Sequence, residues 1–162
     1  MQYTSKHLDS DCISGSPTVA VVEPSPGELK YYIACKNNCS GELSITQMSI
    51  SANSSELTVS LPYFWIKAGG VTISGNPMAA SWNDIIYVFY QSNANNGDLY
   101  CSAYDTSQNK WRHFDDGELS TKIASGVMQG SPGVEIYMGA AWIYYQSKSG
   151  GTMEVTTWLV PF

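Results

Sequence analysis

An internal repeat, marked by three glycine–X–proline triplets, limits the folds that are open to this chain. The triplets are Gly15-Ser16-Pro17, Gly75-Asn76-Pro77 and Gly130-Ser131-Pro132, separated by 60 and 55 residues. The second and third prolines each lie 14 residues before a glutamine, within strand-forming runs at 86–92 and 141–147 that both end in Tyr-Gln-Ser. A repeat of this length predicts several similar structural units rather than one irregular core.

The first copy of the repeat is more diverged than the other two. Residues 30–35 take the place of the strand-forming run. In the three copies a glycine, Gly41, Gly97 or Gly151, then opens a further strand-like segment, and glycine-centred loops between strands are typical of β-hairpins. The sequence therefore predicts a single domain of three units, over residues 15–74, 75–129 and 130–162.

Each unit is expected to contain four strands. Residues 63–66 and 110–114 are the candidates for the fourth, outer strand of the first and second units. The third unit reaches Phe162 directly after its third strand, while residues 2–8 belong to no unit. We therefore expect residues 1–14 to supply the strand that closes the third unit, as one terminus commonly does in a β-propeller.

Composition favours an all-β protein. Strand-forming residues recur in short runs broken by Gly, Pro and Asn, and no stretch has the periodicity of an amphipathic helix. Aromatic residues make up 12% of the chain and charged residues only 14%. This combination indicates a surface that recognises its ligands by ring stacking and neutral hydrogen bonds.

Charge and hydropathy exclude two classes of partner. The net charge is −6 and Arg112 is the single arginine, whereas nucleic-acid binding needs clustered cations. No apolar run approaches the roughly 18 residues that a membrane-spanning helix needs, so we expect no membrane insertion. The first residues lack the basic-then-apolar pattern of a signal peptide. We therefore expect a cytosolic protein, one exported by another route, or a mature form.

Four cysteines, Cys12, Cys35, Cys39 and Cys101, place few constraints on the chain. Cys35 and Cys39 could form half of a metal site, but no second pair of ligands lies at a suitable spacing. A disulfide across a loop, or buried thiols, fits the spacing better than a metal. We expect no metal and no cofactor.

Three blade-like units are too few to close a β-propeller, which typically has four to eight blades. They would also leave two exposed sheet faces and unpaired strand edges. We therefore expect association, most simply a homodimer that forms a six-bladed ring. A different subunit that supplies the other blades is one alternative, and a three-sheet prism or a β-sandwich is another.

The second unit resembles the blade of fungal and bacterial fucose-binding lectins. The resemblance rests on Ala79-Ala80-Ser81-Trp82, the run 86–91, Leu99, Tyr104-Asp105 and Trp111. It covers most of the second unit, the central part of the third and the outline of the first. It implies a six-bladed propeller that binds sugars between adjacent blades.

In that family an arginine and a glutamate hold the hydroxyl groups of the sugar. The arginine position falls on Tyr87, Trp142 and Tyr31, and the glutamate position falls on Cys101, Val155 and Ile45. Neither polar group is retained. The resemblance therefore supports the fold more strongly than it supports fucose as the ligand.

Aromatic side chains are the candidates for carbohydrate binding, because a sugar ring has an apolar C–H face that stacks on Trp or Tyr. The family's stacking aromatics map onto Tyr104 and Trp111, and the first of them onto Trp158. The full candidate set is Trp111, Tyr104, Trp158, Tyr87, Trp142 and Trp82, with Asn83, Asp84, Gln91 and Gln146 as possible hydrogen-bond partners. The alternative for every ring is core packing, and for the two glutamines it is satisfaction of turn backbone.

The sequence favours a lectin that binds glycans or glycoproteins without catalysing a reaction. A glycosidase needs two carboxylates flanking a bond, and the carboxylates Glu23, Asp84, Glu135 and Asp115-Asp116 do not recur at equivalent positions of the repeat. His7 and His113 accompany no recognisable nucleophile motif. A protein-interaction scaffold is the main alternative, since a weakly charged aromatic surface also suits a protein partner.

Overall fold

The chain folds into β-strands throughout the part that the computed structural model describes, residues 2–3, 13–52, 56–60, 65–94 and 96–161. Strands account for 69% of the structure, and the described residues include no helix. The strands are β1 (Gln2–Tyr3), β2 (Ser14–Ser25), β3 (Glu28–Lys36), β4 (Glu42–Ala52), β5 (Glu56–Ser60), β6 (Ile66–Trp82), β7 (Ile85–Ser92), β8 (Leu99–Asp105), β9 (Lys110–Trp111), β10 (Thr121–Ala124), β11 (Met128–Tyr137), β12 (Ala140–Ser147) and β13 (Met153–Leu159).

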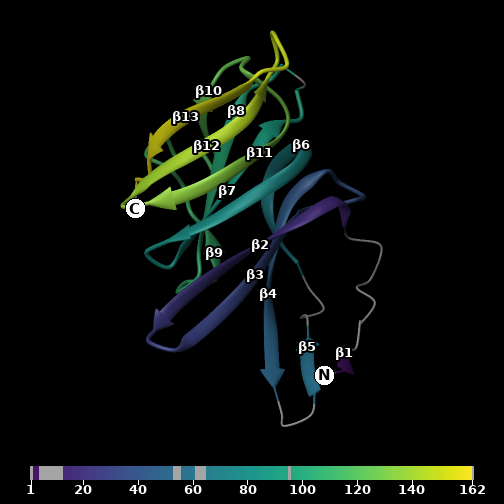
Figure 1. The fold of residues 1–162 in the computed structure, drawn as a ribbon, viewed down its shortest axis with the longest axis vertical. Helices are drawn as coiled ribbons and strands as arrows, with labels where there is room; N and C mark the ends of the chain where they lie inside the picture. Colours follow the sequence, from purple (N-terminus) through teal and green to yellow (C-terminus); the bar gives the residue numbers. More distant parts are fainter. Residues whose placement is uncertain (1, 4–12, 53–55, 61–64, 95, 162) are drawn as a thin grey trace.

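The strands form a ten-stranded sheet and a separate three-stranded sheet. Neighbouring strands pair antiparallel, except for the short parallel pair β1–β5. Figure 1 shows β11, β12 and β13 at one end of the molecule and β1 and β5 at the other. The described strands close into neither a barrel nor a propeller.

Three antiparallel meanders make up the body of the molecule. We call β2–β3–β4 with the first half of β6 the first unit, β7–β8 with the second half of β6 the second unit, and β11–β12–β13 the third unit. The long strand β6 connects the first two units, because its first residues pair with β4 and residues from Ile73 onward pair with β7. For this reason the first two units belong to one continuous sheet.

The glycine–X–proline triplets occupy the same place in each unit. The register shifts at the triplet in all three units, between Ser14 and Thr18, between Ser74 and Met78, and between Gln129 and Gly133. The glycine of each triplet has a positive φ, which glycine adopts without a Cβ clash. The sequence repeat therefore marks a β-bulge that bends the first strand of each unit.

The three bulges contact one another in a row. The N–H of Ser16 donates to Asn76 Oδ1 at 2.8 Å, and the N–H of Asn76 donates to Ser131 Oγ at 2.9 Å. In each step the middle residue of one triplet accepts a hydrogen bond from the main chain of the preceding triplet. The bulges of the three units are therefore joined by a directional chain of hydrogen bonds.

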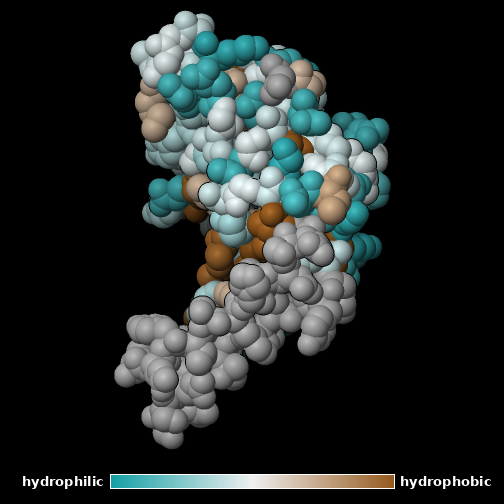
Figure 2. Space-filling model, turned by 90° about the vertical axis from the view of Figure 1, so that its right-hand side faces the viewer, coloured by the Kyte–Doolittle hydropathy of each residue, from teal (hydrophilic) through white to brown (hydrophobic). Residues whose placement is uncertain are grey.

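Two hydrophobic cores lie between the units. The first unit packs on the second through one cluster, and the second packs on the third through another. Strand β7 is buried on both faces, because Ile86, Val88 and Tyr90 point to the first core while Tyr87 and Phe89 point to the second. In contrast, β12 alternates strictly between buried and exposed residues after its first position, as expected for a strand with one covered face. In the view of Figure 2, hydrophobic residues gather at mid-height, whereas mainly hydrophilic residues cover the upper part.

The structure corrects the alignment of the first unit by one residue. Ala34, Phe89 and Tyr144 pair with the residue directly after the proline of their triplets, which makes Tyr32 the counterpart of Tyr87 and Trp142. The sequence alignment chose Tyr31, because it was set by the spacing to the following glycine, and the turn before Gly97 in the second copy is one residue longer than the turn before Gly41 in the first. A one-residue shift matters in a strand because it moves each side chain to the opposite face.

The outer strands differ from the sequence expectation. The candidate at 110–114 forms only the two-residue strand β9, and β10, which the sequence did not suggest, also pairs with β8. In the first unit β5 and the start of β6 share the edge of β4. Of the candidate at 63–66, only residues 65–66 are described.

The expected closing strand is also different. Within residues 1–14, Gln2 and Tyr3 form β1, which pairs with β5 and not with β13. The expectation that these two residues form a strand of the third unit is therefore wrong within one chain. They pair instead with the edge of β5 in the first half of the molecule. Residues 4–12 lie outside the described part.

Candidate functional site

A cleft of about 510 Å³ lies where the first and second units meet. Its lining comes from the start of β6, from β7 and β8, and from the loop between β9 and β10. The lining residues are Gly69, Gly70, Val71, Thr72, Tyr90, Ser92, Tyr100, His113, Gly117, Glu118, Leu119 and Ser120. The cleft is therefore mainly polar, with tyrosine rings among its lining.

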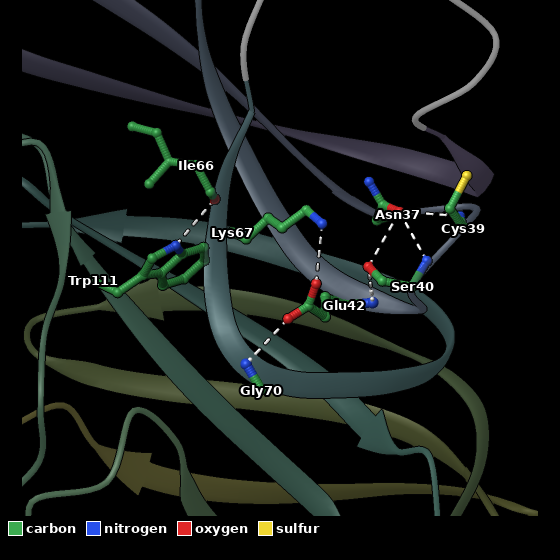
Figure 3. Close-up of polar contacts among 8 residues, drawn as sticks. All are labelled: Asn37, Cys39, Ser40, Glu42, Ile66, Lys67, Gly70 and Trp111. Atoms are coloured by element: carbon green, nitrogen blue, oxygen red, sulfur yellow. Dashed lines mark hydrogen bonds and ion pairs between the residues drawn. The ribbon is translucent and has the colours of Figure 1, made fainter.

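One wall of the cleft is a bulge of β6, held in place by Glu42 of β4. Residues 68–71 bulge out because Glu42 pairs with Thr72 while Ser44 pairs with Lys67. The N–H of Gly70 donates to Glu42 Oε1 at 3.1 Å, and Lys67 Nζ lies 3.3 Å from Glu42 Oε2 (Figure 3). Glu42 thus holds this segment of β6 through both carboxylate oxygens, one bonded to the main chain of Gly70 and the other paired with the side chain of Lys67.

The environment of Glu42 favours its ionised form. Hydrogen bonds from Ser40 and from the Gly70 main chain lower the pKa of Glu42, and Lys67 adds to the effect. The charged form accepts these bonds, whereas a protonated carboxyl would lose part of them. The support of the wall is therefore intact at neutral pH.

The opposite wall is the loop between β9 and β10. Its turn is closed by main-chain bonds between Phe114 and Glu118 at 2.9 Å and between Gly117 and Phe114 at 2.9 Å. His113 Nδ1 lies 2.6 Å from the Gly117 carbonyl oxygen, and since a carbonyl only accepts, Nδ1 carries the proton. In the neutral ring His113 Nε2 is then an acceptor at the cleft.

Two tyrosines from neighbouring strands lie together in the cleft lining. The rings of Tyr90 and Tyr100 stack at 6.3 Å between centroids with an interplanar angle of 11°. Tyr90 is buried and shares a 2.9 Å hydrogen bond with Ser102 Oγ, and burial raises the pKa of its phenol. Tyr100 is half-buried, and Lys122 Nζ lies 5.6 Å from its ring centroid.

Three of the candidate sugar-binding aromatics lie in the cores. Trp111 and Tyr104 form a T-shaped pair at 5.4 Å in the first core, and Tyr87 is fully buried in the second. Burial also raises the pKa of Tyr104 to about 12. The indole N–H of Trp111 donates to the Ile66 carbonyl oxygen at 3.1 Å (Figure 3). These three rings act as packing groups in the described chain.

The other three candidate rings are more accessible but do not converge. Trp158 is half-buried and contacts Tyr87 and Phe89 edge-on at 6.2 and 6.1 Å. Trp82 is half-buried beside Gly139, and Trp142 is exposed on the outer face of the third unit. None of these candidates lines the cleft between the first two units.

The candidate hydrogen-bond partners hold the backbone. Asn83 and Asp84 have positive φ values of 48° and 61° and form the two-residue turn between β6 and β7, as expected for a type I′ hairpin. Gln91 is buried, and its Oε1 accepts the N–H of Gly130 at 3.1 Å. The expectation that Gln91 satisfies backbone is therefore confirmed, although the backbone belongs to the bulge of the next unit. Gln146 is exposed and donates to the Gly151 carbonyl oxygen at 3.5 Å.

Sequence reasoning missed the cleft residues Tyr100, Glu118 and His113 as a group. A signal for Tyr100 was present in the sequence. Cys101 lies at the position of the family's glutamate, and Tyr100 directly before it points to the opposite face of the strand, because successive residues of a strand alternate between faces. Nothing in the sequence placed the loop 112–120 opposite the start of β6, since that contact depends on how two units pack.

The cysteines and acidic residues form no metal site in the part of the chain that the structure describes. No group of three His, Cys, Asp or Glu side chains comes together there. Cys35, Cys39 and Cys101 carry thiols rather than a disulfide, and burial raises the pKa of Cys101 well above its usual value. Cys12 lies outside the described residues. None of the described elements is a helix long and apolar enough to cross a membrane.

Comparison with known proteins adds no functional information to these features. No protein-family model matches the chain, and no curated protein matches it.

Proposed function

We propose that this protein binds glycans in the cleft between its first and second units. The observation that carries the proposal is the position and chemistry of the cleft. It lies at a junction of two sheet units, which is where the lectin resemblance expects a sugar, and its lining combines the half-buried Tyr100 with hydroxyl and carboxylate groups.

The polar lining suits the hydroxyl groups of a sugar. Glu118 is an acceptor, His113 Nε2 is a second acceptor, and Thr72, Ser92 and Ser120 can each donate and accept. A saccharide presents neighbouring donors and acceptors together with an apolar C–H face. Because Tyr90 stacks on the Tyr100 ring and Lys122 lies over it, Tyr100 offers a ligand its ring edge and its hydroxyl. Fixed neutral groups and one carboxylate favour a neutral polar ligand over a phosphorylated one.

Binding without hydrolysis is the better-supported activity. Among the described residues that line the cleft, Glu118 is the only carboxylate. Hydrolysis of a glycosidic bond usually requires a second carboxylate about 5–10 Å away. We therefore propose a lectin, with a β-propeller assembled from more than one chain as its architecture.

A protein-interaction scaffold is the second candidate, favoured by a separate observation. The outer face of the third unit exposes Trp142, Tyr144, Val155 and Leu159. A surface of this kind is typical of a protein interface, but it lies on a different unit from the cleft.

A glycan-array screen with free-sugar competition tests the lectin proposal. We expect competable binding, weakened at least tenfold by Tyr100→Ser and by Glu118→Gln, corresponding to about 1.4 kcal/mol for each. The matched controls are Tyr137→Ser and Glu135→Gln, both outside the cleft. A blank array, or binding that both cleft variants retain, would overturn the proposal in favour of the scaffold.

A further inference from the structure

We propose that the outer face of the third unit docks onto the first unit of a second copy of this chain, and that two copies close head to tail into a ring of six units. Such an assembly does not depend on the glycan proposal. Two independent sets of contacts that the chain already uses between its own units support it.

The first observation is an exposed face whose counterparts are buried. Trp142, Tyr144 and Val155 are 43%, 40% and 52% exposed on the outer face of the third unit. Their counterparts in the second unit, at the same register positions, are Tyr87, Phe89 and Cys101, all 0% exposed against the third unit.

The first unit repeats the same relationship. Its residues Tyr32, Ala34 and Ile45 occupy those register positions and are buried in the first core. At both internal junctions this face is therefore covered by the next unit. On the third unit it is exposed in a single chain, and its side chains are as apolar as the buried ones.

On the opposite face of the first unit, β2 offers the complementary surface, whereas Ile33 and Cys35 of β3 on the same face are already buried in a single chain. Val19 and Val21 are 51% and 39% exposed on β2. Their counterparts in the third unit are Val134 and Ile136, which pack into the second core against the second unit. Val19 and Val21 thus stand where a preceding unit packs in the rest of the molecule, and a third unit from another copy provides such a unit.

The second observation is the directional chain of hydrogen bonds along the bulges. Ser16 donates through its N–H to Asn76, and Asn76 donates through its N–H to Ser131. If this chain of hydrogen bonds continues by one step, the N–H of Ser131 donates to the residue at the same place in the next unit. That residue is Ser16 of a second copy, whose hydroxyl matches the Ser131 Oγ that already accepts in the second junction.

Gln146 continues a further contact in the same direction. Gln91 Oε1 accepts the N–H of Gly130 across the second junction, and the register makes Gln146 the counterpart of Gln91. Gln146 is exposed, with its amide nitrogen directed to Gly151. In the assembly, Gln146 Oε1 is the counterpart of Gln91 Oε1 and would accept the N–H of Gly15 from a second copy.

These contacts specify a head-to-tail arrangement rather than a face-to-face one. A junction that joins different surfaces of two copies forms a ring if the rotation closes and a filament if it does not. Two copies of three units give six, within the four to eight units at which sheets arranged around an axis close. The occupant of the exposed face is therefore a second copy, in the orientation that the internal junctions already show.

Sedimentation equilibrium and light scattering test the proposal with the full chain. We expect a mass of about twice the 17.7 kDa of one chain. Trp142→Glu on the third unit and Val19→Glu on the first should each shift the protein to a single chain at micromolar concentration, while Gln108→Glu in an exposed turn should not. Circular dichroism confirms that each variant folds, which we expect because both side chains are exposed in a single chain.

Mixing the two variants separates the possible arrangements. In a head-to-tail ring, the intact third unit of Val19→Glu can still dock onto the intact first unit of Trp142→Glu, so the mixture should recover part of the two-chain species. A dimer that Trp142→Glu dissociates and Val19→Glu leaves intact would indicate face-to-face pairing of third units and overturn the proposal. A single-chain mass for the unmodified protein, or a mass above two chains, would overturn it as well.

Discussion

The indole N–H of Trp111 donates to the main-chain carbonyl of Ile66 at 3.1 Å, which joins the outer strand of the second unit to the start of β6 beside the first. The Trp111 ring is 7% exposed and packs edge-on against Tyr104. The same bond anchors β6 just before the bulge that forms one wall of the cleft. Trp111 is therefore a structural residue of the cleft and not a surface for stacking a ligand.

Replacing Trp111 should destabilise the fold. Trp111→Ala removes a large buried ring, and we expect the free energy of unfolding to fall by about 3–5 kcal/mol. Trp111→Phe keeps most of the packing and leaves the Ile66 carbonyl without its donor, so the loss should be smaller, about 1–2 kcal/mol. Urea unfolding measures both, with the exposed Tyr137→Phe as a control. Wild-type stability for Trp111→Ala would contradict the role assigned to this ring.

Asn76 should control the junction between the first two bulges. Asn76→Ala removes the Oδ1 that accepts the Ser16 N–H, and we expect a loss of about 1 kcal/mol. Hydrogen exchange at the Ser16 amide should accelerate in the same variant. Asn76→Asp keeps an acceptor and should restore protection, whereas Asn93→Ala in an exposed turn should change neither quantity. Equal exchange at Ser16 in Asn76→Ala and wild type would show that this bond does not hold the junction.

Gly97 should tolerate no side chain. A Cβ at this position would lie 2.8 Å from the Met128 carbonyl oxygen, and its φ of +83° is unfavourable for other residues. Gly117 has a similar φ of +81°, but a Cβ there would meet nothing within 4 Å, which makes it a matched control. We expect Gly117→Ala to cost about 1–2 kcal/mol from backbone strain alone, and Gly97→Ala to cost at least about 1 kcal/mol more from the clash. Equal unfolding midpoints for the two variants would contradict the close approach.

Asp98 should make the fold sensitive to acid. Its carboxylate lies 2.7 Å from Lys122 Nζ and accepts the N–H of Gly126 at 2.8 Å. Lys122 is the largest cause that lowers the pKa of Asp98, with Gly126 and Asn96 contributing. A carboxyl whose pKa is lower in the folded state stabilises the fold fully above its unfolded pKa of about 4, and the contribution is lost as the pH falls through the folded value.

Urea unfolding between about pH 2 and pH 6 measures this contribution. Asp98→Asn should be less stable than wild type at pH 6, and the difference should shrink as the pH falls below about 4. The exposed Asp115→Asn should leave the pH profile unchanged. A difference between Asp98→Asn and wild type that persists undiminished at the lowest pH would assign the effect to packing rather than to charge.

The all-β class, the central strands of each unit and the place of the three triplets follow from the amino-acid sequence, whereas only the strand pairing shows that each triplet is a bulge within a strand. Short runs of Val, Ile, Tyr and Thr between glycines favour β-structure, and the triplets at Gly15, Gly75 and Gly130 recur because each bulge needs a glycine with a positive φ. The repeat also identified the equivalent hairpins, since turn chemistry is local. The alignment failed by one residue at Tyr31 and Tyr32, because the turn before Gly97 is one residue longer than the turn before Gly41, and only the pairing with β2 reveals the shift.

The burial of each aromatic residue, and the place where a ligand has room, depend on the packing of the units. Tyr87 and Trp142 occupy the same register position, yet one is fully buried and the other exposed, because the third unit covers the second, whereas no described unit covers this face of the third. The cleft likewise requires residues 69–72 and 113–120 to meet across two units. Such contacts join segments far apart in the sequence, which local propensity and periodicity do not encode.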